Sequence, residues 1–400
     1  MENWELKLND IAYFVEDKIS SENIKLDQYV TTDSLLQNKK GRTFAQNLPP
    51  QKCSLVHFKK GDVLLGNIRP YLKKIWYANI EGGCSQDVLV LRAKNNLESK
   101  FLYALLMQDS FFDYEMKATK GSKMPRGDKS HIINFPCLDL NNKTEIGKLL
   151  SSLDDKIALN NRINAKLEQM AKRLYDYWFV QFDFPNADGK PYKSTGGKMV
   201  WNETLKREIP DGWEVGNLYD IAEYVNGLAC QNYRPKESEK SLPVIKIREM
   251  NEGITADTEK VSASIPGKYR IYAGDILFSW SASLEIKIWT GETGGLNQHI
   301  FKVIPKGYFS KGYVYQQLSA YLVNFQKMAE SRKTTMGHIT SDHIKQSRIL
   351  IPLKEIISAF NEKTFSIFNY QLSIEKETQK LTALRDRLLP LLMNGQVVVE

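Results

Sequence analysis

Residues 149–185, LLSSLDDKIALNNRINAKLEQMAKRLYDYWFVQFDFP, decide how the rest of the chain is organised. Apolar side chains recur in this stretch at steps of mostly three or four residues, at Leu149, Leu153, Ile157, Ile163, Leu167, Met170, Leu174 and Trp178. This spacing predicts one face of a long amphipathic helix, which at ~1.5 Å per residue would be ~50 Å long. Asn160 and Asn164 lie on or beside that face, where a polar side chain costs stability but fixes the register of a helix pair. A helix of this length needs an equally long partner.

The C-terminal end of the chain supplies a partner over residues 353–395, where apolar residues recur in the same way. Pro390 is expected to kink or fray its last turns, and Asn394-Gly395 fits a helix C-cap. A small globule cannot cover so long an apolar stripe, so the two helices are expected to pack on each other as an antiparallel coiled coil rather than each on its own globule. The residues predicted to serve helix pairing or partner docking are Leu153, Ile157, Asn160, Ile163, Leu167, Met170, Leu174, Trp178, Ile367, Ile374, Leu381, Leu384 and Leu388.

Short motifs recur in the same order in the two halves of the chain. Trp4-Glu5-Leu6 returns as Trp213-Glu214-Val215, and Gly61-Asp62-Val63-Leu64 returns as Gly274-Asp275-Ile276-Leu277. Colinear matches over the whole length indicate two tandem copies of one unit, related by an internal pseudo-two-fold repeat.

Each copy opens with strand-like segments, continues with a helical stretch and a polar segment that contains glycine, and ends in a long helix. The fold class predicted is therefore mixed α/β. The domains predicted are a first globular domain over 1–140, a central helix over 141–182, a linker over 183–212, a second globular domain over 213–352 and a C-terminal helix over 353–395.

Composition places the chain among ordinary folded proteins. It has 400 residues, 42% of them hydrophobic, and a formal net charge of +8, which permits nucleic-acid binding without demanding it. No apolar run is long enough for a membrane span, and the N-terminus does not resemble a secretory signal. The four cysteines form no CxxC pair, so a reducing, cytoplasmic location is expected.

Motifs for catalysis are missing from the sequence. There is no GxxxxGK[ST] phosphate loop, no Asn/Asp-Pro-Pro-Tyr methyltransferase motif and no HExxH zinc motif. Asp275, Glu285 and Lys287 do follow the order of a metal-dependent nuclease site. The first copy has Leu72 and Lys74 where the second has Glu285 and Lys287, so a Gly-Asp turn that needs its aspartate explains the recurrence better. We expect neither a catalytic site nor a metal or cofactor on this chain.

Candidate nucleic-acid contacts cluster in residues 117–129, KATKGSKMPRGDK, where exposed cations could straddle phosphates and reach guanine edges. A merely solvated basic loop would look the same by charge. The matching place in the second copy holds different polar side chains, as expected of two readers of different sequences. The DNA-binding residues predicted are Arg69, Tyr71, Lys73, Lys120, Ser122, Lys123, Arg126, Lys129, Arg234, Trp280, Ser281, Arg332, Lys333, Thr334 and His338.

The stretch LDDKIALNNRINAKLEQMAKRLYDYWFVQFDFP, followed by NADGKPYKSTGGKMVWNETLKREIPDGWEV, closely resembles the central region of specificity subunits of bacterial type I restriction–modification enzymes. The resemblance implies that each globule is a target-recognition domain that reads one half of an asymmetric, bipartite DNA target. It implies that the helices set the spacing and dock two modification subunits, which bind S-adenosylmethionine and methylate adenine. Two restriction subunits with ATP and Mg²⁺ would complete the complex, and this chain would be non-catalytic. The alternative is a protein-binding scaffold with two globular modules on a helical rod.

Overall fold

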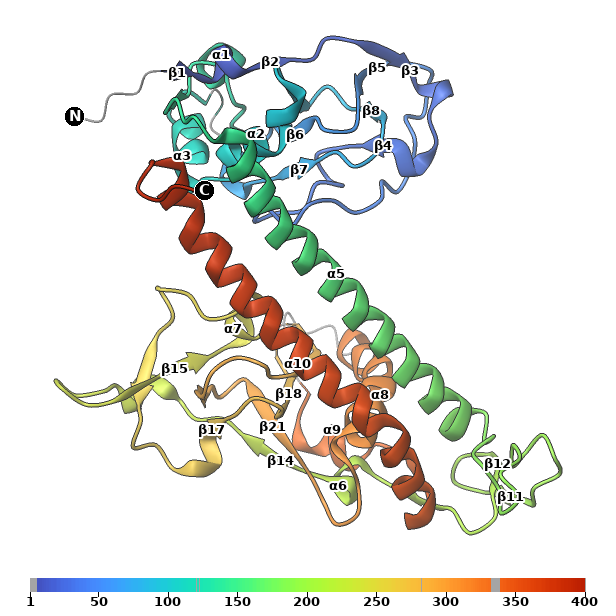
Figure 1. Cartoon of the computed structure of the whole chain (residues 1–400). Helices are drawn as coiled ribbons and strands as arrows, with labels where there is room; N and C mark the ends of the chain where they lie inside the picture. The colour runs from blue at the N-terminus through green and yellow to red at the C-terminus, as the bar shows by residue number, and fades with distance from the viewer. Residues whose placement is uncertain (1–5, 120, 122, 282, 332–338, 400) are drawn as a thin grey trace. The chain divides into compact units, whose positions relative to one another are not determined.

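The computed structural model describes residues 6–119, 121, 123–281, 283–331 and 339–399 (Figure 1). The chain forms two compact units. Unit 1 comprises Met1–Leu159 and Gln379–Glu400, and unit 2 comprises Asn160–Thr378. Both borders fall inside the two long helices, α5 (Lys143–Tyr175) and α10 (Lys354–Met393), so each unit contains one end of each helix. In the described part of the chain, no helix is both long and apolar enough to cross a membrane.

Unit 1 is built on two four-stranded sheets. The order β2-β9-β6-β7 is antiparallel throughout, whereas in β3-β5-β8-β4 the strand β4 runs parallel to β8. All four residues of β6 are buried, as expected of a short apolar run at the centre of a sheet. The strands are β1 (Leu6–Lys7), β2 (Ala12–Phe14), β3 (Lys18–Ser20), β4 (Tyr29–Val30), β5 (Ser54–Phe58), β6 (Val63–Gly66), β7 (Ile75–Tyr77), β8 (Gly82–Cys84), β9 (Val88–Ala93) and β10 (Pro136–Cys137).

Unit 2 repeats this plan with sheets β14-β21-β18-β19 and β16-β15-β20-β17, in which β15 runs parallel to β20. Two further pairs, β13-β22 and the hairpin β11-β12, lie outside these sheets. The strands are β11 (Met199–Asn202), β12 (Arg207–Pro210), β13 (Glu214–Gly216), β14 (Ala222–Asn226), β15 (Ser241–Ile245), β16 (Lys260–Ser262), β17 (Arg270–Ile271), β18 (Ile276–Ser279), β19 (Glu285–Ile288), β20 (Gly294–Leu296), β21 (Ile300–Pro305) and β22 (Ile349–Ile351).

The helical elements also follow the repeat. Unit 1 contains α1 (Leu8–Ile11), α2 (Ser99–Leu106), α3 (Asp109–Lys117) and α4 (Lys129–Ile132), with 3₁₀ turns η1 (Ser21–Asn23), η2 (Leu26–Gln28), η3 (Pro70–Leu72) and η4 (Asn96–Glu98). Unit 2 contains α6 (Leu218–Ile221), α7 (Ile247–Glu252), α8 (Lys311–Ser331) and α9 (Ser341–Lys345), with η6 (Cys230–Tyr233) and η7 (Gly267–Tyr269). A π-helical turn, η5 (Asp176–Val180), continues α5.

The two copies share their frame and differ at one sheet edge. The strand β8 lies between a parallel and an antiparallel neighbour, β4 and β5, and β20 lies in the same way between β15 and β17. The fourth strand extends the sheet on opposite sides, because β3 pairs with β5 whereas β16 pairs with β15. The predicted mixed α/β fold with an internal repeat is confirmed.

The recurring aspartates make the same local bonds in both copies. The carboxylate of Asp62 accepts the backbone N–H of Lys59 at 2.7 Å, and that of Asp275 accepts the N–H of Tyr272 at 2.9 Å. The preceding glycines, Gly61 and Gly274, have φ of 96° and 94°, a left-handed conformation that favours glycine. The Gly-Asp motif is therefore a turn in both copies, as the sequence predicts.

Each unit has one main apolar core that includes one end of the helix pair. In unit 1, Ile146 of α5 and Leu392 of α10 pack in a cluster with Phe101 and Phe111. In unit 2, Trp178 and Phe360 pack with Tyr313 of α8, and the rings of Trp178 and Phe360 are 5.7 Å apart. Fully burying such a side chain contributes ~1.5–3 kcal/mol, so the helix ends are integral parts of the two globules.

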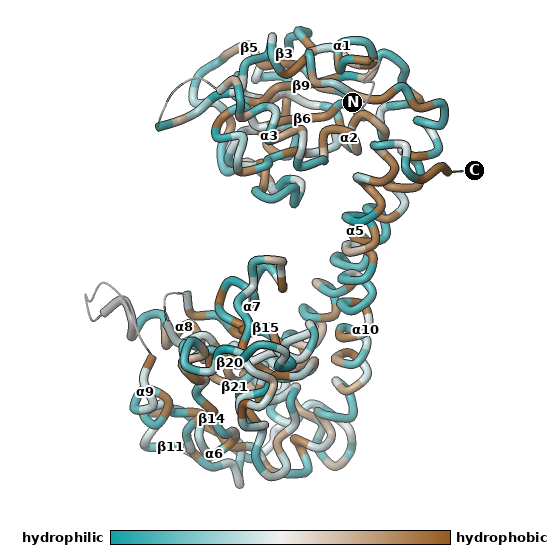
Figure 2. Tube along the Cα trace, turned by 90° about the vertical axis from the view of Figure 1, so that its left-hand side faces the viewer, coloured by the Kyte–Doolittle hydropathy of each residue, from teal (hydrophilic) through white to brown (hydrophobic). Residues whose placement is uncertain are grey.

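The helices α5 and α10 pack together in an antiparallel register, as predicted. Asp154 binds Arg385 at 2.9 Å in unit 1, and in unit 2 Asn160 donates to Glu377 at 2.9 Å and Asn164 to Glu375 at 3.1 Å. Hydropathy alternates along both helices, as Figure 2 shows. The pairing face, which we call the seam, is never exposed and follows an unbroken alternation of three- and four-residue steps, the spacing of a coiled coil. It consists of Ile146, Leu150, Leu153, Ile157, Asn160, Asn164, Leu167, Ala171, Leu174 and Trp178 on α5, and of Ile357, Phe360, Thr364, Ile367, Gln371, Ile374, Thr378, Leu381, Arg385, Leu388 and Leu392 on α10.

Two exposed residues of the set predicted for helix pairing or partner docking lie outside the seam. Met170 is 55% exposed and Leu384 is 45% exposed, so neither is a seam residue. The buried position beside Met170 belongs to Ala171, and Ile163 lies half-buried beside Asn164. The physical reason is that the seam passes through the two asparagines, whereas the apolar pattern alone steps around them.

Residues 183–212 form a structured connection. The segment contains the hairpin β11-β12, and Phe184 stacks between Tyr192 and Trp213 with ring centroids 4.6 and 5.3 Å away. At the other end of the chain, α10 continues through Pro390 to Met393, so its last turn does not fray. Gly395 then has φ of 66°, and the N–H of Gln396 donates to the carbonyl of Leu391 at 2.9 Å, which confirms the predicted C-cap.

Candidate nucleic-acid interface

The structure brings two of the predicted DNA-binding segments of unit 1 side by side. Ile68 forms a β-bridge with Arg126, the N–H of Arg69 donates to the carbonyl of Pro125 at 2.8 Å, and the N–H of Gly127 donates to that of Asn67 at 3.2 Å. We call residues 67–73 and 123–129 together the unit 1 recognition surface. Segments more than fifty residues apart in sequence thus present their side chains at one place.

Exposed cations define this surface. Lys123, Arg69 and Arg126 are exposed, and Arg126 pairs with Asp87 at 3.1 Å. An ion pair between such exposed side chains contributes only ~0–1 kcal/mol, so a phosphate or a guanine edge can replace Asp87. Tyr71 is half exposed and offers a ring for stacking.

Two further predicted cations are held by neighbours. Lys73 and Lys39 both bind Asp109, at 2.7 and 2.8 Å. Burial opposes ionisation of Asp109, but the hydrogen bonds from the two lysines outweigh it and hold the pKa of Asp109 below its ordinary value. The Nζ of Lys129 lies 5.5 Å from the centroid of the Phe14 ring. Lys73 therefore helps to hold the surface together in addition to adding charge.

The equivalent place in unit 2 has the same backbone link and different side chains. The N–H of Ile339 donates to the carbonyl of Trp280 at 3.0 Å, as Gly127 donates to Asn67 in unit 1. Trp280 is half-buried, and its indole N–H donates to Asn226 at 3.0 Å. Ser281 is only 6% exposed, and this burial speaks against its prediction as a DNA contact.

Six predicted contact residues lie outside the residues that the structure describes: Lys120, Ser122, Arg332, Lys333, Thr334 and His338.

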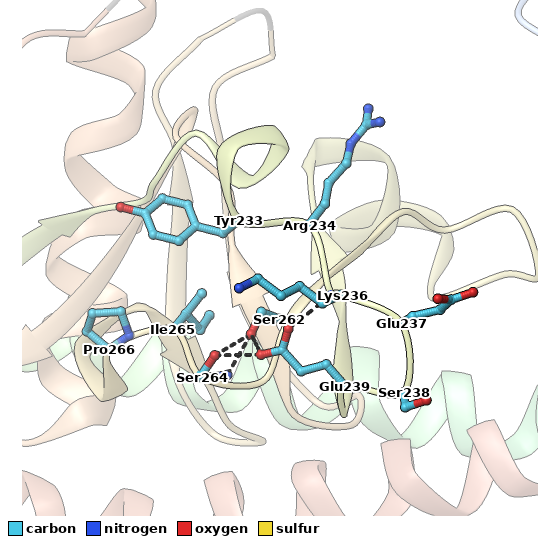
Figure 3. Close-up of a pocket in the computed structure, with 10 residues that line it drawn as sticks. All are labelled: Tyr233, Arg234, Lys236, Glu237, Ser238, Glu239, Ser262, Ser264, Ile265 and Pro266. Carbon is cyan, nitrogen blue, oxygen red and sulfur yellow. Dashed lines mark hydrogen bonds between the residues drawn. The ribbon is translucent and has the colours of Figure 1, made fainter.

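Arg234 lies beside a pocket of about 510 Å³ on unit 2, shown in Figure 3. Glu239 is the polar centre of this pocket and accepts hydrogen bonds from Ser262, Ser264 and the N–H of Lys236. These bonds, led by that from Ser262, lower the pKa of Glu239 to about 2. The Arg234 guanidinium points away from Glu239, so its charge faces outward. The sequence did not predict this pocket. Ser262 and Ser264 lie more than twenty residues after Glu239 in the chain, and no sequence motif links them to it.

The sequence also did not predict a buried carboxyl group, that of Glu115, next to the unit 1 recognition surface. Glu115 is fully buried and neither carboxylate oxygen has a hydrogen-bond partner in the structure. The nearby Asn67 Oδ1 is likewise buried without a partner. A Cβ at Gly127 would overlap Glu115 Oε1 and lie 2.9 Å from Asn67 Oδ1, so both oxygens face the same narrow space.

An apolar groove of about 610 Å³ lies where α5 ends in unit 2. We call it the helix-end groove, and it is lined by Met170, Arg173, Leu174, Asp176, Tyr177, Gln181 and Ile367. Val180 and Phe365, from the same helix ends, are also more than half exposed. Exposed apolar side chains gathered on one face are typical of a protein-binding surface.

The nuclease-like residues do not form a site. Glu285 pairs with Ser279 at one end of the β18-β19 hairpin, whereas Asp275 precedes Ile276 at the other end. Four residues of strand separate these ends, roughly 13 Å at ~3.4 Å per residue. Lys287 donates to the carbonyl of Met250. Among the described residues, no group of three or more His, Cys, Asp or Glu side chains could hold a metal ion.

The sequence matches a known protein family. A family model described as "Type I restriction modification DNA specificity domain" matches residues 1–169 and 210–384. The specificity subunit of the type I restriction enzyme HindI from Haemophilus influenzae is 26% identical over 463 aligned positions, which cover 99% of this chain and 100% of that protein. The specificity subunit of MjaIX from Methanocaldococcus jannaschii is 25% identical over 363 positions, covering 88% and 81%.

A solved structure has the same fold. The crystal structure of a type I restriction-modification system S subunit from M. genitalium matches with a TM-score of 0.55 and 14% identity, over 96% of this chain and 94% of that one. At this identity the likeness concerns the fold alone.

Proposed function

Because the chain belongs to the type I restriction–modification DNA specificity domain family, we propose that it is the non-catalytic DNA-recognition subunit of a type I restriction–modification complex. Each globular domain reads one half of a bipartite target, and the paired helices set the distance between the halves. The observation that carries the proposal is the repeated frame with unlike surfaces: the same backbone link joins Gly127 to Asn67 and Ile339 to Trp280, while the side chains around it differ. Two unlike readers imply an asymmetric target.

The division of labour along the chain follows the predicted domains. Residues 1–140 form the first target-recognition domain and 213–352 the second, while 141–182 and 353–395 are the spacer helices and 183–212 the connection between them. Recognition of the first half-site rests on Arg69, Lys123 and Arg126, whose exposed charges meet phosphates and base edges. Arg234 serves the second domain, since its charge faces outward.

The enzymatic steps belong to partner subunits. Two modification subunits carry S-adenosylmethionine and methylate adenine, and two restriction subunits use ATP and Mg²⁺. The helix-end groove is the docking surface that we assign to a modification subunit, with Met170 and Tyr177 as its apolar contacts. The complex works in the cytoplasm, where its DNA is.

Exchange of one domain tests this proposal. The assembled complex is expressed with residues 1–140 replaced by those of another family member, and methylated adenines are mapped across the host genome. We expect one half-site to change while the other half-site and the gap stay as in the unmodified complex. A change in both half-sites would contradict the assignment of one reader to each domain.

A further inference from the structure

The buried carboxyl group of Glu115 has no counter-charge. It lies on α3 and is fully buried, and none of the described side chains or backbone groups gives either of its oxygens a hydrogen bond. A buried carboxylate without a donor is very costly, whereas the neutral acid needs one acceptor for its proton. Burial raises the pKa of Glu115 to about 8.

An acceptor faces Glu115 across a narrow space. Asn67 Oδ1 is buried without a partner, and Gly127, which separates it from Glu115, leaves no room for a Cβ between the two oxygens. A proton on Glu115 would give the Asn67 Oδ1 a donor and would remove the buried negative charge. Asn67 and Gly127 are themselves joined through the backbone, so this contact lies at the base of the unit 1 recognition surface.

The charged groups on the elements around α3 do not bond to Glu115. The elements packed against it are η3, α2 and α4. Lys73, beside η3, binds Asp109; on α4, His131 contacts the carbonyl of Tyr114 and Lys129 lies over the Phe14 ring. Arg126 pairs with Asp87 and the carboxylate of Asp128 caps α4, while Lys100 on α2 has no bond to Glu115. None of them donates to Glu115.

Unit 2 provides an internal comparison. The matching backbone donor is Ile339, which is buried in the apolar core together with Phe325. The donor of the link in unit 2 is thus an apolar core residue, whereas the donor in unit 1, Gly127, lies against the side-chain oxygens of Glu115 and Asn67.

We propose that Glu115, as a neutral carboxylic acid, donates its O–H to Asn67 Oδ1 and thereby positions residues 123–128 for reading the first half-site. This role rests on the proposed function, because it assigns a positioning residue to that reader. It also makes the reader sensitive to alkali: once the proton is lost, a buried anion faces an amide oxygen and the base of the surface opens. Among the described residues of unit 2, no carboxylate oxygen is buried without a hydrogen-bond partner, so the second reader is expected to keep its affinity.

The test compares Glu115→Gln and Glu115→Leu with the unmodified chain in complex with its modification subunits. The glutamine amide can donate to Asn67 Oδ1 without titrating, whereas leucine leaves that oxygen unpaired. The probe is a fluorescent duplex carrying the site mapped from methylated adenines, together with duplexes altered in one half-site. Fluorescence anisotropy is measured from pH 6.5 to 9.5.

We expect E115Q to discriminate the first half-site like the unmodified chain at pH 7 and to keep that discrimination at pH 9.5. The unmodified chain should lose it as pH rises through about 8. E115L should discriminate the first half-site about tenfold less well than E115Q at every pH, because leucine leaves the buried Asn67 Oδ1 without a donor. Discrimination of the second half-site should be the same in all three proteins, which also controls for folding.

Two results would overturn the inference. In the first, E115Q discriminates the first half-site as weakly as E115L at pH 7, which would show that an anion is required. In the second, the unmodified chain discriminates the first half-site at pH 9.5 as well as E115Q does. Failure of all three proteins to discriminate any site would instead refute the proposed function. Hydrogen exchange of peptides covering 123–128 then still decides the role of Glu115. Exchange at pH 9 should be faster in the unmodified chain than in E115Q, and equal rates would refute it.

Discussion

At the scale of single residues, Arg126 is the cation that we expect to read DNA under the proposed function. It is bound into the surface through its backbone bridge to Ile68, while its side chain is more than half exposed and pairs with the partly exposed Asp87. A planar guanidinium can bind a guanine edge through two parallel hydrogen bonds, which an ammonium group cannot do.

We expect Arg126→Ala to weaken recognition of the first half-site by ~1–3 kcal/mol, about five- to 150-fold. Compared with Arg126→Ala, Arg126→Lys should bind DNA of any sequence more tightly, but it should not regain discrimination between bases. Anisotropy titrations with matched and altered duplexes measure both. Lys60→Ala is the control, because Lys60 is an exposed cation before β6, at the far end of that strand from Asn67. Equal losses in R126A and K60A would show that only overall charge matters.

Glu115 also makes stability depend on pH. Its pKa is raised from 4.5 to about 8 in the folded chain, so the folded state binds more protons than the unfolded state between these values. The contribution is fully present below about pH 4.5 and is lost as pH rises toward 8. We therefore expect the stability of the unmodified chain relative to E115Q to fall over this window in denaturant unfolding. A constant difference between the two proteins would contradict a neutral buried Glu115.

At the scale of elements, the seam of the helix pair carries a polar layer. Asn160 and Asn164 donate to Glu377 and Glu375, but their own Oδ1 atoms are buried without a partner. Thr364 and Thr378 turn their hydroxyls to carbonyls of their own helix, at 2.9 Å. Such a layer costs stability, and its asymmetry selects one register among those that an all-apolar seam would allow.

The double variant Asn160→Leu and Asn164→Leu should therefore be more stable by ~1–3 kcal/mol, the usual cost of an unsatisfied buried polar group. It should also pair its helices less uniquely. Thermal unfolding measures the gain in stability. Mapping of methylated adenines measures the loss of unique pairing, which would appear as a spread of gap lengths between the half-sites. Asn161→Leu is the matched control, since Asn161 is exposed on the same helix. A more stable variant with one unchanged gap would show that the asparagines do not set the register.

At the scale of the whole molecule, the net charge of +8 predicts how affinity responds to salt. Each phosphate neutralised by a cation releases counterions, so the logarithm of the binding constant falls steeply with the logarithm of salt concentration. We expect such a slope for the assembled complex, and a slope lower by about one in Arg126→Ala if that side chain binds phosphate. A flat response would instead favour the alternative of a protein-binding scaffold.

The sequence alone determined the fold class, the repeat and the helix pair. These rest on periodic apolar patterns and on turns such as Gly61-Asp62, whose causes are local in the chain. It also pointed to residues 123–129 of the unit 1 recognition surface, because a basic stretch that contains glycine carries its signal in composition. Only the tertiary structure decided that Asn67 and Gly127 meet, that Glu115 lies buried beside them, and that Ser281 is buried. Contacts between residues far apart in sequence depend on how strands and helices pack, and no local pattern encodes them. The sequence placed Asn160 and Asn164 on or beside the apolar face of helix 149–185. Only the packing against α10 showed that Ala171, and not Met170, occupies the next seam position.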